Sequence, residues 1–393
     1  MQTLISRYCI LLLCSLLVFT TACKESDPSA PSDGRTDTEN STSKVDDPIV
    51  PFSSALPAIE NLNDNPPNQA KILLGRYIFY DKALSTDNST SCASCHAPSQ
   101  GFADQGHATS RGVNGQMGDR NAMALVNVAF SSHLVWDGRF KNLEEHAIAP
   151  ILHPKEMGNG SQRPREDTSA YGGTPTNNDT LFLFQRMRGD KGSSGVDGFV
   201  RKSTYTKLFK AAFGDSIITL NRIAKAIASF ERTMISNQSP FDEYARGNKA
   251  ALKDNEKRGL ALFLDKTKTN CSSCHSGTLF TDNKMHSNGL YKYYEKDKGL
   301  GAFTKKSSDD GVFKTPTLRN VAVTAPYMHD GSFADLEQVI KHYRSGGAHN
   351  VNQDHLIKPL NLTDQDVDDL AAFLKSLTDT KFMTNPAFSN PWK

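Results

Sequence analysis

One five-residue pattern occurs twice in the chain, as CASCH at residues 92–96 and as CSSCH at residues 271–275. In a Cys-x-x-Cys-His motif the two thiols can bond to the two vinyl groups of one haem, and the adjacent histidine then ligates the iron. A structural zinc site would need four ligands, whereas each motif offers three, and a thioredoxin-like dithiol needs no histidine. The sequence therefore predicts two covalently bound c-type haems.

The predicted haem-binding residues account for four of the seven cysteines. They are Cys92, Cys95 and His96 in the first motif and Cys271, Cys274 and His275 in the second, with His96 and His275 as iron ligands. The other three cysteines are Cys9, Cys14 and Cys23, all near the N-terminus. No cysteine is then left for a structural disulfide.

The N-terminus reads as an export signal. An apolar run over residues 8–19 follows Arg7 and is too short to span a membrane. The residues before Cys23 are small and resemble a lipobox, although Thr20 stands where leucine is usual; ordinary signal cleavage near Cys23 is the alternative. We expect a signal peptide over residues 1–22, a lipid on Cys23, and anchoring at the periplasmic face of the bacterial envelope.

Residues 23–50 are rich in Ser, Thr, Asp and Pro, and we expect them to form a disordered tether. The rest should fold as a soluble globule, because the whole chain is 37% hydrophobic and 22% charged. The formal net charge is only +2 and there is no dense basic stripe, which argues against a nucleic-acid partner.

The two halves repeat each other beyond the haem motifs. Asn127-Val128-Ala129 stands nine residues before Trp136-Asp137-Gly138, and Asn320-Val321-Ala322 stands nine residues before His329-Asp330-Gly331. We therefore predict an internal duplication of one cytochrome c-like unit, with haem domains over residues 51–200 and 201–393.

The predicted fold class is all-α. Apolar residues recur at helical spacing over 221–235, 336–343 and 363–377. Thr363 and Asp366 are spaced as a capping box, and Gly346 and Gly347 should end the helix before them. Residues 158–197 read as a long loop with one short apolar piece.

Residues 57–377 resemble the bacterial di-haem cytochrome c peroxidase family, and in particular its MauG-like branch. Beside the two motifs, the resemblance rests on VWDGRFKNLEEHAIAPI (135–151), TPTLRNVAVTAPYMHDGSF (315–333) and LEQVIKHYRSGG (336–347). It implies that the first haem reacts with hydrogen peroxide and that the second is six-coordinate and stores or passes electrons.

The resemblance also assigns site residues. It implies that Trp136 lies between the haems and that Glu156 is the catalytic acid–base above the first iron. Pro150 matches a distal proline of the family, whereas His146 stands at the position of a glutamine, which should change the distal hydrogen bonding. His153 could tune Glu156 or lie at the surface.

A calcium ion between the domains is a further implication of the family resemblance. Its ligands would be Asn121 and the main-chain carbonyls of Thr324 and Pro326. His107 is the candidate for a reversible distal ligand of the first haem, although an exposed loop histidine is the simpler interpretation.

Tyr343, fourteen residues after His329, occupies the position of the sixth ligand of the second iron. Many members have methionine there, and MauG-type members have tyrosine. A phenolate stabilises ferric iron, whereas a thioether favours the ferrous state. Tyr343 could instead be a packed helix residue, with His342, Met328 or Met285 as the ligand.

The function implied is reduction of hydrogen peroxide to water with electrons from a small periplasmic donor, such as a cytochrome c or a cupredoxin. One alternative is a MauG-like enzyme that oxidises a partner protein through a high-valent two-iron state. MauG uses a surface tryptophan for this, and Thr269 stands at its position. A non-enzymatic di-haem electron carrier is the other alternative. A homodimer is compatible with each of them.

Overall fold

The computed structural model describes residues 55–59, 62, 64–160, 183–189 and 196–392. The expected signal peptide, Cys23, the tether and most of the predicted 158–197 loop lie outside these ranges. In the part that the structure describes, no helix combines the length and apolar character needed to cross a membrane.

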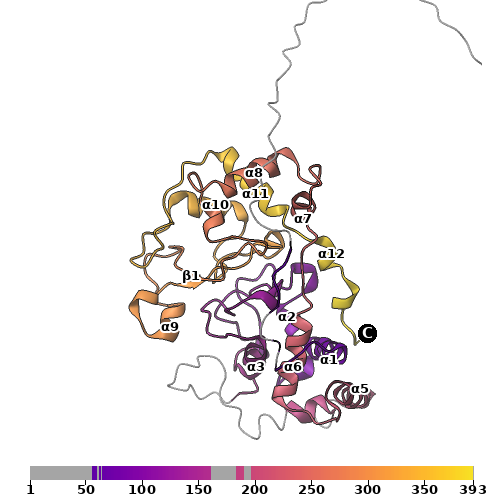
Figure 1. Ribbon diagram of the computed structural model, residues 1–393. Coiled ribbons are helices and arrows are strands. Elements are labelled where there is room, and N and C mark those ends of the chain that lie inside the picture. Colours follow the sequence, from indigo (N-terminus) through magenta and orange to yellow (C-terminus); the bar gives the residue numbers. More distant parts are fainter. Residues whose placement is uncertain (1–54, 60–61, 63, 161–182, 190–195, 393) are drawn as a thin grey trace, which may run out of the picture. The chain divides into compact units, whose positions relative to one another are not determined.

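Helices make up most of the regular structure, as predicted (Figure 1). They are α1 (Gln69–Tyr80), α2 (Cys92–Cys95), α3 (Leu143–Leu152), α5 (Val196–Phe213), α6 (Leu220–Glu231), α7 (Pro240–Ala245), α8 (Asp254–Leu264), α9 (Leu300–Thr304), α10 (Leu336–Ser345), α11 (Asp364–Lys375) and α12 (Thr380–Met383). Two two-residue strands, β1 (Met285–His286) and β2 (Phe313–Lys314), pair antiparallel. They are too short to leave an alternating sequence pattern, and the all-α prediction missed them.

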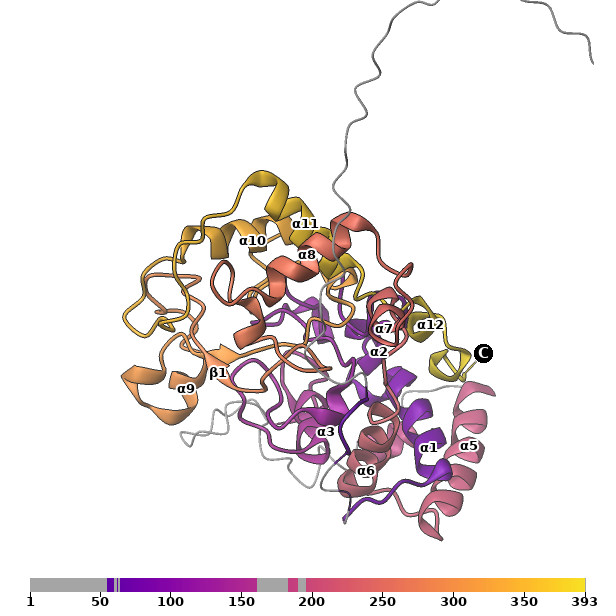
Figure 2. The ribbon, with the colours of Figure 1, turned by 45° about the horizontal axis from the view of Figure 1, so that its top comes forward.

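The first haem motif sits beside a group of helices formed by α1, α3, α5 and α6. α1 packs along α6 and also contacts α5, and α3 packs on the other side of α6 (Figures 1 and 2). Gly75 makes the α1–α6 contact possible, because a Cβ atom there would lie 1.9 Å from the carbonyl oxygen of Ala226. The boundary expected at residue 200 falls within α5.

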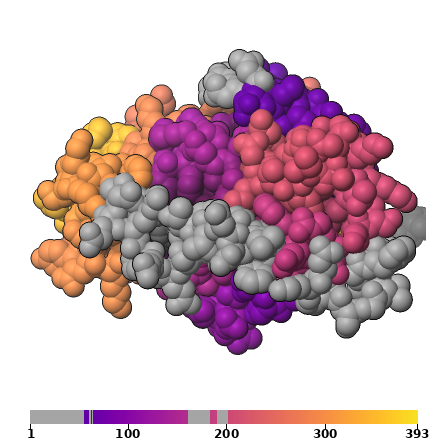
Figure 3. Space-filling view, turned by 90° about the horizontal axis from the view of Figure 1, so that it is seen from below, coloured from indigo at the N-terminus to yellow at the C-terminus, as the bar shows by residue number. Residues whose placement is uncertain are grey.

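The second haem motif sits beside α8, α10 and α11. α8 packs along α11, and α10 packs on α11 as well. The α8–α11 contact repeats the geometry of the first half, since a Cβ on Gly259 would lie 1.9 Å from the carbonyl oxygen of Asp369. In the space-filling view the segment of α9 and the segment of α5 and α6 lie at opposite ends of one face (Figure 3).

The two predicted caps are confirmed, whereas the helix predicted over 221–235 ends earlier, at Glu231. The Thr363 hydroxyl accepts from the amide of Asp366, whose side chain accepts from the amide of Thr363, so the capping box is formed. Helix α10 ends at Gly346, which has a φ of 83°. A left-handed backbone of this kind favours glycine.

Several irregular backbone features occur at equivalent places in the two halves. Asn127 and Asn320 adopt left-handed conformations, with φ of 56° and 59°, and each precedes a 3-10 turn. Antiparallel bridges join Leu134 to Phe140 and Tyr327 to Phe333.

Candidate active site

The first motif is presented by the short helix α2. Cys92 and Cys95 are not in a disulfide. The Nδ1 atom of His96 lies 2.9 Å from the carbonyl oxygen of Phe102 and donates to it in the tautomer that satisfies both groups. That tautomer leaves Nε2 unprotonated, which is the form in which a histidine ligates iron.

The second motif repeats this arrangement. Cys271 and Cys274 are also free thiols, and the Nδ1 atom of His275 lies 3.1 Å from the carbonyl oxygen of Phe280. Phe102 and Phe280 both have a positive φ, of 59° and 52°. The same loop geometry therefore orients both histidines.

One continuous cavity joins the two motifs. Its walls include all four motif cysteines, both motif histidines, and side chains from α3, α6, α10 and α11. Burial raises the pKa of Cys95 and of Cys274 to about 11, so both thiols are uncharged near neutral pH. Free thiols, tautomer-fixed histidines and a shared apolar cavity together fit two thioether-bound haems.

Glu156 lies in the cavity wall just after α3. Its main chain is held by the amide of Val113, which donates to the Glu156 carbonyl at 3.0 Å. Burial raises the pKa of the Glu156 carboxyl to about 7, and the Asp119 charge adds to this while Arg139 opposes it. Although the side chain is 43% accessible, it is also part of the cavity wall, so its accessible surface faces the place where a ligand would bind.

His153 lies close to this carboxyl. Its Nδ1 atom is 3.4 Å from Oε1 of Glu156, and the side chain is buried rather than at the surface. Burial lowers the pKa of His153 to about 4, so the imidazole is neutral at pH 7. His153 is thus a neutral polar neighbour of Glu156, and the positive charge that acts on the carboxyl is that of Arg139.

His146 and Pro150 come from α3 and also line the cavity. Burial, followed by the charges of His96 and Arg139, lowers the pKa of His146 to about 4. Its buried Nδ1 atom has no hydrogen-bond partner among the described residues. The imidazole of His146 is therefore neutral at pH 7, with hydrogen-bonding capacity left for a ligand in the cavity.

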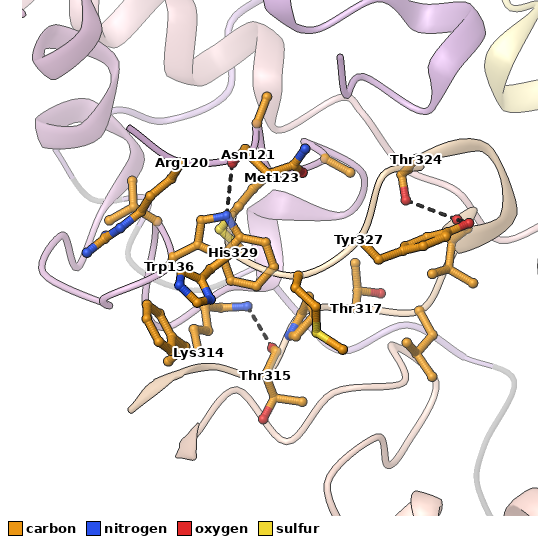
Figure 4. A pocket seen from close by; sticks show the side chains of 18 of the residues that line it. Arg120, Asn121, Met123, Trp136, Lys314, Thr315, Thr317, Thr324, Tyr327 and His329 are labelled. Atoms are coloured by element: carbon orange, nitrogen blue, oxygen red, sulfur yellow. Dashed lines mark hydrogen bonds between the residues drawn. The ribbon is translucent and has the colours of Figure 1, made fainter. Parts of the chain in front are cut away.

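Trp136 lines the cavity where the two halves meet. Its indole Nε1 donates to the carbonyl of Asn121 at 2.9 Å, and Figure 4 shows the ring beside His329 and Lys314.

The expected calcium ligands, Asn121, Thr324 and Pro326, line the same cavity. The Asn121 amide nitrogen donates to the carbonyls of His107 and Ala108, each at 3.2 Å, which directs it away from any cation bound through Oδ1.

Tyr343 projects from α10 into the cavity around the second motif. Burial raises the pKa of its hydroxyl to about 12, and the nearby thiols of Cys271 and Cys274 also raise it. The hydroxyl would therefore need a strong electrophile such as ferric iron to ionise at neutral pH.

The three alternative ligands differ in placement. His342 is held by the carbonyl of Asn288, at 3.0 Å from Nε2. The sulfur of Met285 lies against Gly138. Met328 lines the cavity, and its sulfur accepts from the side-chain amide of Asn288 at 3.3 Å. Of the three, Met328 is therefore the one in the cavity wall.

The structure also places His107 and Thr269, the two other residues that the sequence analysis considered. The side chain of His107 is 66% exposed and its Nδ1 lies 2.8 Å from Asp104, as expected for a loop histidine. Thr269 is buried, and its hydroxyl donates to the carbonyl of Leu262. It offers no aromatic ring at the position of the MauG surface tryptophan.

Several charged residues of the cavity wall were not predicted from the sequence, among them Arg139, Glu231 and Lys314. Arg139 pairs with Asp137 at 2.9 Å. Glu231 is 4% exposed, its Oε2 atom has no partner among the described residues, and burial raises its pKa to about 8. A comparison of the two halves could have found Glu231, because the equivalent position on α11 is Leu374.

Comparison with known proteins agrees with this geometry. Residues 69–250 match the family model described as di-haem cytochrome c peroxidase, and residues 256–378 match cytochrome c. The methylamine utilization protein MauG of Methylophilus methylotrophus is 36% identical over 315 residues, which cover 80% of this chain and 84% of that protein. The chain belongs to the di-haem cytochrome c peroxidase family.

Other members of the family are similar over the same region. The cytochrome c551 peroxidase of Nitrosomonas europaea is 31% identical, with 85% of each chain covered. Among solved structures, a MauG-like protein associated with microbial copper homeostasis has a TM-score of 0.74 at 32% identity and covers 86% of this chain and 97% of its own. These relatives are named as peroxidases or as MauG proteins, so the predicted family and enzyme class are confirmed.

Proposed function

We propose that the protein is a peroxidase that reduces hydrogen peroxide to water with electrons from a small donor such as a cytochrome c or a cupredoxin. One observation carries this proposal: Glu156, whose pKa of about 7 allows it both to accept and to release a proton, lines the cavity that contains His96. A general acid–base works best when its pKa lies near the operating pH.

Cys92, Cys95 and His96 would hold one haem, and Cys271, Cys274, His275 and Tyr343 the other. When bound, the haems supply the iron that binds peroxide and the electrons that reduce it. Each peroxide consumes two electrons and two protons and yields two waters. Glu156 would take the proton from the inner oxygen of peroxide and deliver it to the outer oxygen, which then leaves as water rather than as hydroxide.

The other distal residues shape this reaction. His146 would offer a ring N–H as a hydrogen-bond donor to peroxide, in the place where other family members have an amide. His153 keeps the Glu156 carboxyl oriented without adding positive charge, because its own pKa is lowered to about 4. Pro150 has no amide hydrogen and so presents an apolar wall to the cavity.

Trp136 would carry electrons between the two haem sites, since it lies on the seam between the halves and lines their common cavity.

The tyrosine at position 343, which would stabilise ferric iron, favours the MauG-like branch and hence a second candidate function, oxidation of a partner protein. Thr269 weighs against that alternative because it offers no aromatic relay. The carboxyl of Glu156 in the cavity argues against a simple electron carrier.

The proposal also covers the internal duplication, the domain boundary, calcium binding, location and assembly. The equivalent left-handed asparagines and glycine-mediated helix contacts support an internal duplication. Because α6 packs on α1, we place the boundary between the haem domains near residue 250 rather than 200. Calcium at Asn121, Thr324 and Pro326, periplasmic location, a lipid on Cys23 and a homodimer also remain proposals.

A turnover experiment tests the function. The haem-loaded protein is mixed with hydrogen peroxide and a reduced cytochrome c or cupredoxin, and the loss of peroxide and the oxidation of donor are followed together. The proposal expects two donor electrons per peroxide. Donor oxidation without peroxide consumption would support the electron carrier, and slow turnover with every small donor would support oxidation of a partner protein.

A further inference from the structure

Lys314 is a buried cation in the cavity wall without a carboxylate partner among the described residues. The residue is 5% exposed and ends strand β2. Its ammonium group donates to the carbonyl of Thr315 at 3.1 Å. Burial lowers the pKa of Lys314 to about 8. A buried ammonium group is costly unless an anion and hydrogen bonds compensate for its lost hydration.

No described residue forms an ion pair with Lys314 that would supply that anion. Asp282 is the carboxylate that raises the pKa of Lys314, but it is bonded to His286 at 2.9 Å. His286 in turn bonds Asp354 at 2.7 Å, so these two carboxylates share a different partner. Burial lowers the pKa of His133, another residue of the cavity wall, and the charges of Lys141 and Lys314 lower it further. The anion that matches Lys314 must therefore come from the cavity.

Lys314 is fixed beside the second haem motif. Its main-chain amide donates to the carbonyl of Trp136 at 2.8 Å, which ties the strand to the seam between the halves. Pro316, two residues further along, lies close enough to the His275 ring for its carbonyl to raise the pKa of that ring. The same short segment thus touches the second motif and carries the buried cation.

The duplication gives Lys314 a counterpart in the first half. The offset that relates Trp136 to His329 also relates Asn121 to Lys314. The main-chain amides of both residues make equivalent hydrogen bonds across the seam. Asn121 donates to the carbonyl of His329 at 2.8 Å, as Lys314 donates to the carbonyl of Trp136. At this position the first half therefore has the side chain of Asn121, which is suited to calcium, and the second half has the ammonium group of Lys314.

We propose that Lys314 binds a propionate carboxylate of the haem attached at Cys271 and Cys274. A haem c has two propionates, and these are the carboxylates that the bound cofactor would bring into this cavity. The charge-assisted hydrogen bond would neutralise the buried charge of Lys314 and that of the propionate. The proposal rests on the presence of the second haem and not on the peroxidase reaction, so its test does not depend on turnover.

The test measures the reduction potentials of both haems in Lys314→Met, which removes the charge and keeps the length of the side chain. Loss of the cation leaves a propionate charge unneutralised, which stabilises ferric iron. The second haem should therefore become harder to reduce by about tenfold in the one-electron equilibrium, or about 59 mV. Lys314→Arg should keep most of the wild-type potential.

Lys284→Met is the matched control, because Lys284 is exposed and directly precedes strand β1. It removes the same charge from the same side of the molecule and should leave both potentials unchanged. Equal potentials in Lys314→Met and in the control would overturn the proposal, and so would a shift confined to the first haem.

A second measurement does not depend on the variants folding. An experimental structure of the haem-loaded wild-type protein should place Nζ of Lys314 within 4 Å of a propionate oxygen of the second haem, the usual limit for an ion pair. If Nζ instead meets a carboxylate of the protein, or no anion, the proposal is wrong even when the enzyme reduces peroxide. Absence of peroxide reduction with the ion pair present would count only against the proposed function.

Discussion

The indole nitrogen of Trp136 donates a 2.9 Å hydrogen bond to the main-chain carbonyl of Asn121. The ring proposed to carry electrons is thus attached to the residue proposed to bind calcium. Any ion held by the Asn121 side chain and the carbonyls of Thr324 and Pro326 would fix the distance between the halves and the orientation of this ring. Metal binding and electron transfer should therefore be coupled.

Removal of calcium is expected to slow electron transfer between the haems. Treatment with a calcium chelator should lower peroxide turnover, because Asn121 and with it Trp136 lose their fixed position. Metal analysis before and after treatment checks that an ion has left, and stopped-flow absorbance measures the transfer rate. Added calcium should restore the rate, whereas magnesium, which prefers six ligands in a tighter geometry, should not. Full activity after complete removal would contradict the site.

Glu156→Gln should lower peroxide turnover by about 10²-fold or more, the usual scale for a lost acid–base group. In the wild type the rate should rise as the pH increases through about 7, because the carboxylate form accepts the first proton. That ionisation should disappear from the pH profile of the variant. Glu145→Gln, on the exposed side of α3, is the control and should behave as the wild type. An unchanged profile in Glu156→Gln would remove this residue from the mechanism.

Tyr343→Met should raise the reduction potential of the second haem, because a thioether favours ferrous iron and a phenolate favours ferric iron. Tyr343→Phe should leave that iron five-coordinate or bound to water or Met328, which changes its electron paramagnetic resonance spectrum. The exposed Tyr293 offers a control in Tyr293→Phe. If both Tyr343 variants keep the wild-type spectrum and potential, the residue is only part of the helix packing.

Glu231 should make folding stability depend on pH. Its pKa is raised from 4.5 to about 8, so between these values the folded protein keeps a proton that the unfolded chain releases. The free energy of unfolding should therefore fall as the pH rises from 4.5 to 8. Glu231→Gln removes the ionisation and should be more stable than the wild type at pH 8, by on the order of 1–3 kcal/mol.

Denaturant unfolding of the haem-loaded proteins at pH 5 and pH 8 measures this effect. The exposed Glu295 serves as the control, since Glu295→Gln should leave the pH dependence of stability as it is. A wild-type protein that is equally stable at both pH values would show that Glu231 is not held in its protonated form.

The haem motifs, the helix ends and the family could be predicted because each depends on a few residues close together in the sequence. The capping box at Thr363 and the glycine end at Gly346 are local in this way. The packing of α6 on α1 could not be predicted in this way, because it depends on a contact between Gly75 and Ala226, which are far apart along the chain.

The unpredicted charges of the cavity have the same explanation. Nothing beside Lys314 in the sequence marks it as buried, and Glu231 stands out only when the two halves are compared. Their roles come from the meeting of α6, β2 and the haem motifs in three dimensions. The position of His153 likewise could not be predicted, because it depends on the turn after α3. This turn places the His153 ring 3.4 Å from the Glu156 carboxyl.

The cavity that joins the two motifs also bears on how the protein matures. Its walls include apolar side chains from both halves, among them Ile227, Leu370 and Leu374. In a globular protein such side chains normally touch other apolar atoms, so here the porphyrins must act as the missing interior of the fold. A chain without its cofactors would expose these surfaces to water, to proteases and to other chains. Supply of haem should therefore limit how much of this protein accumulates.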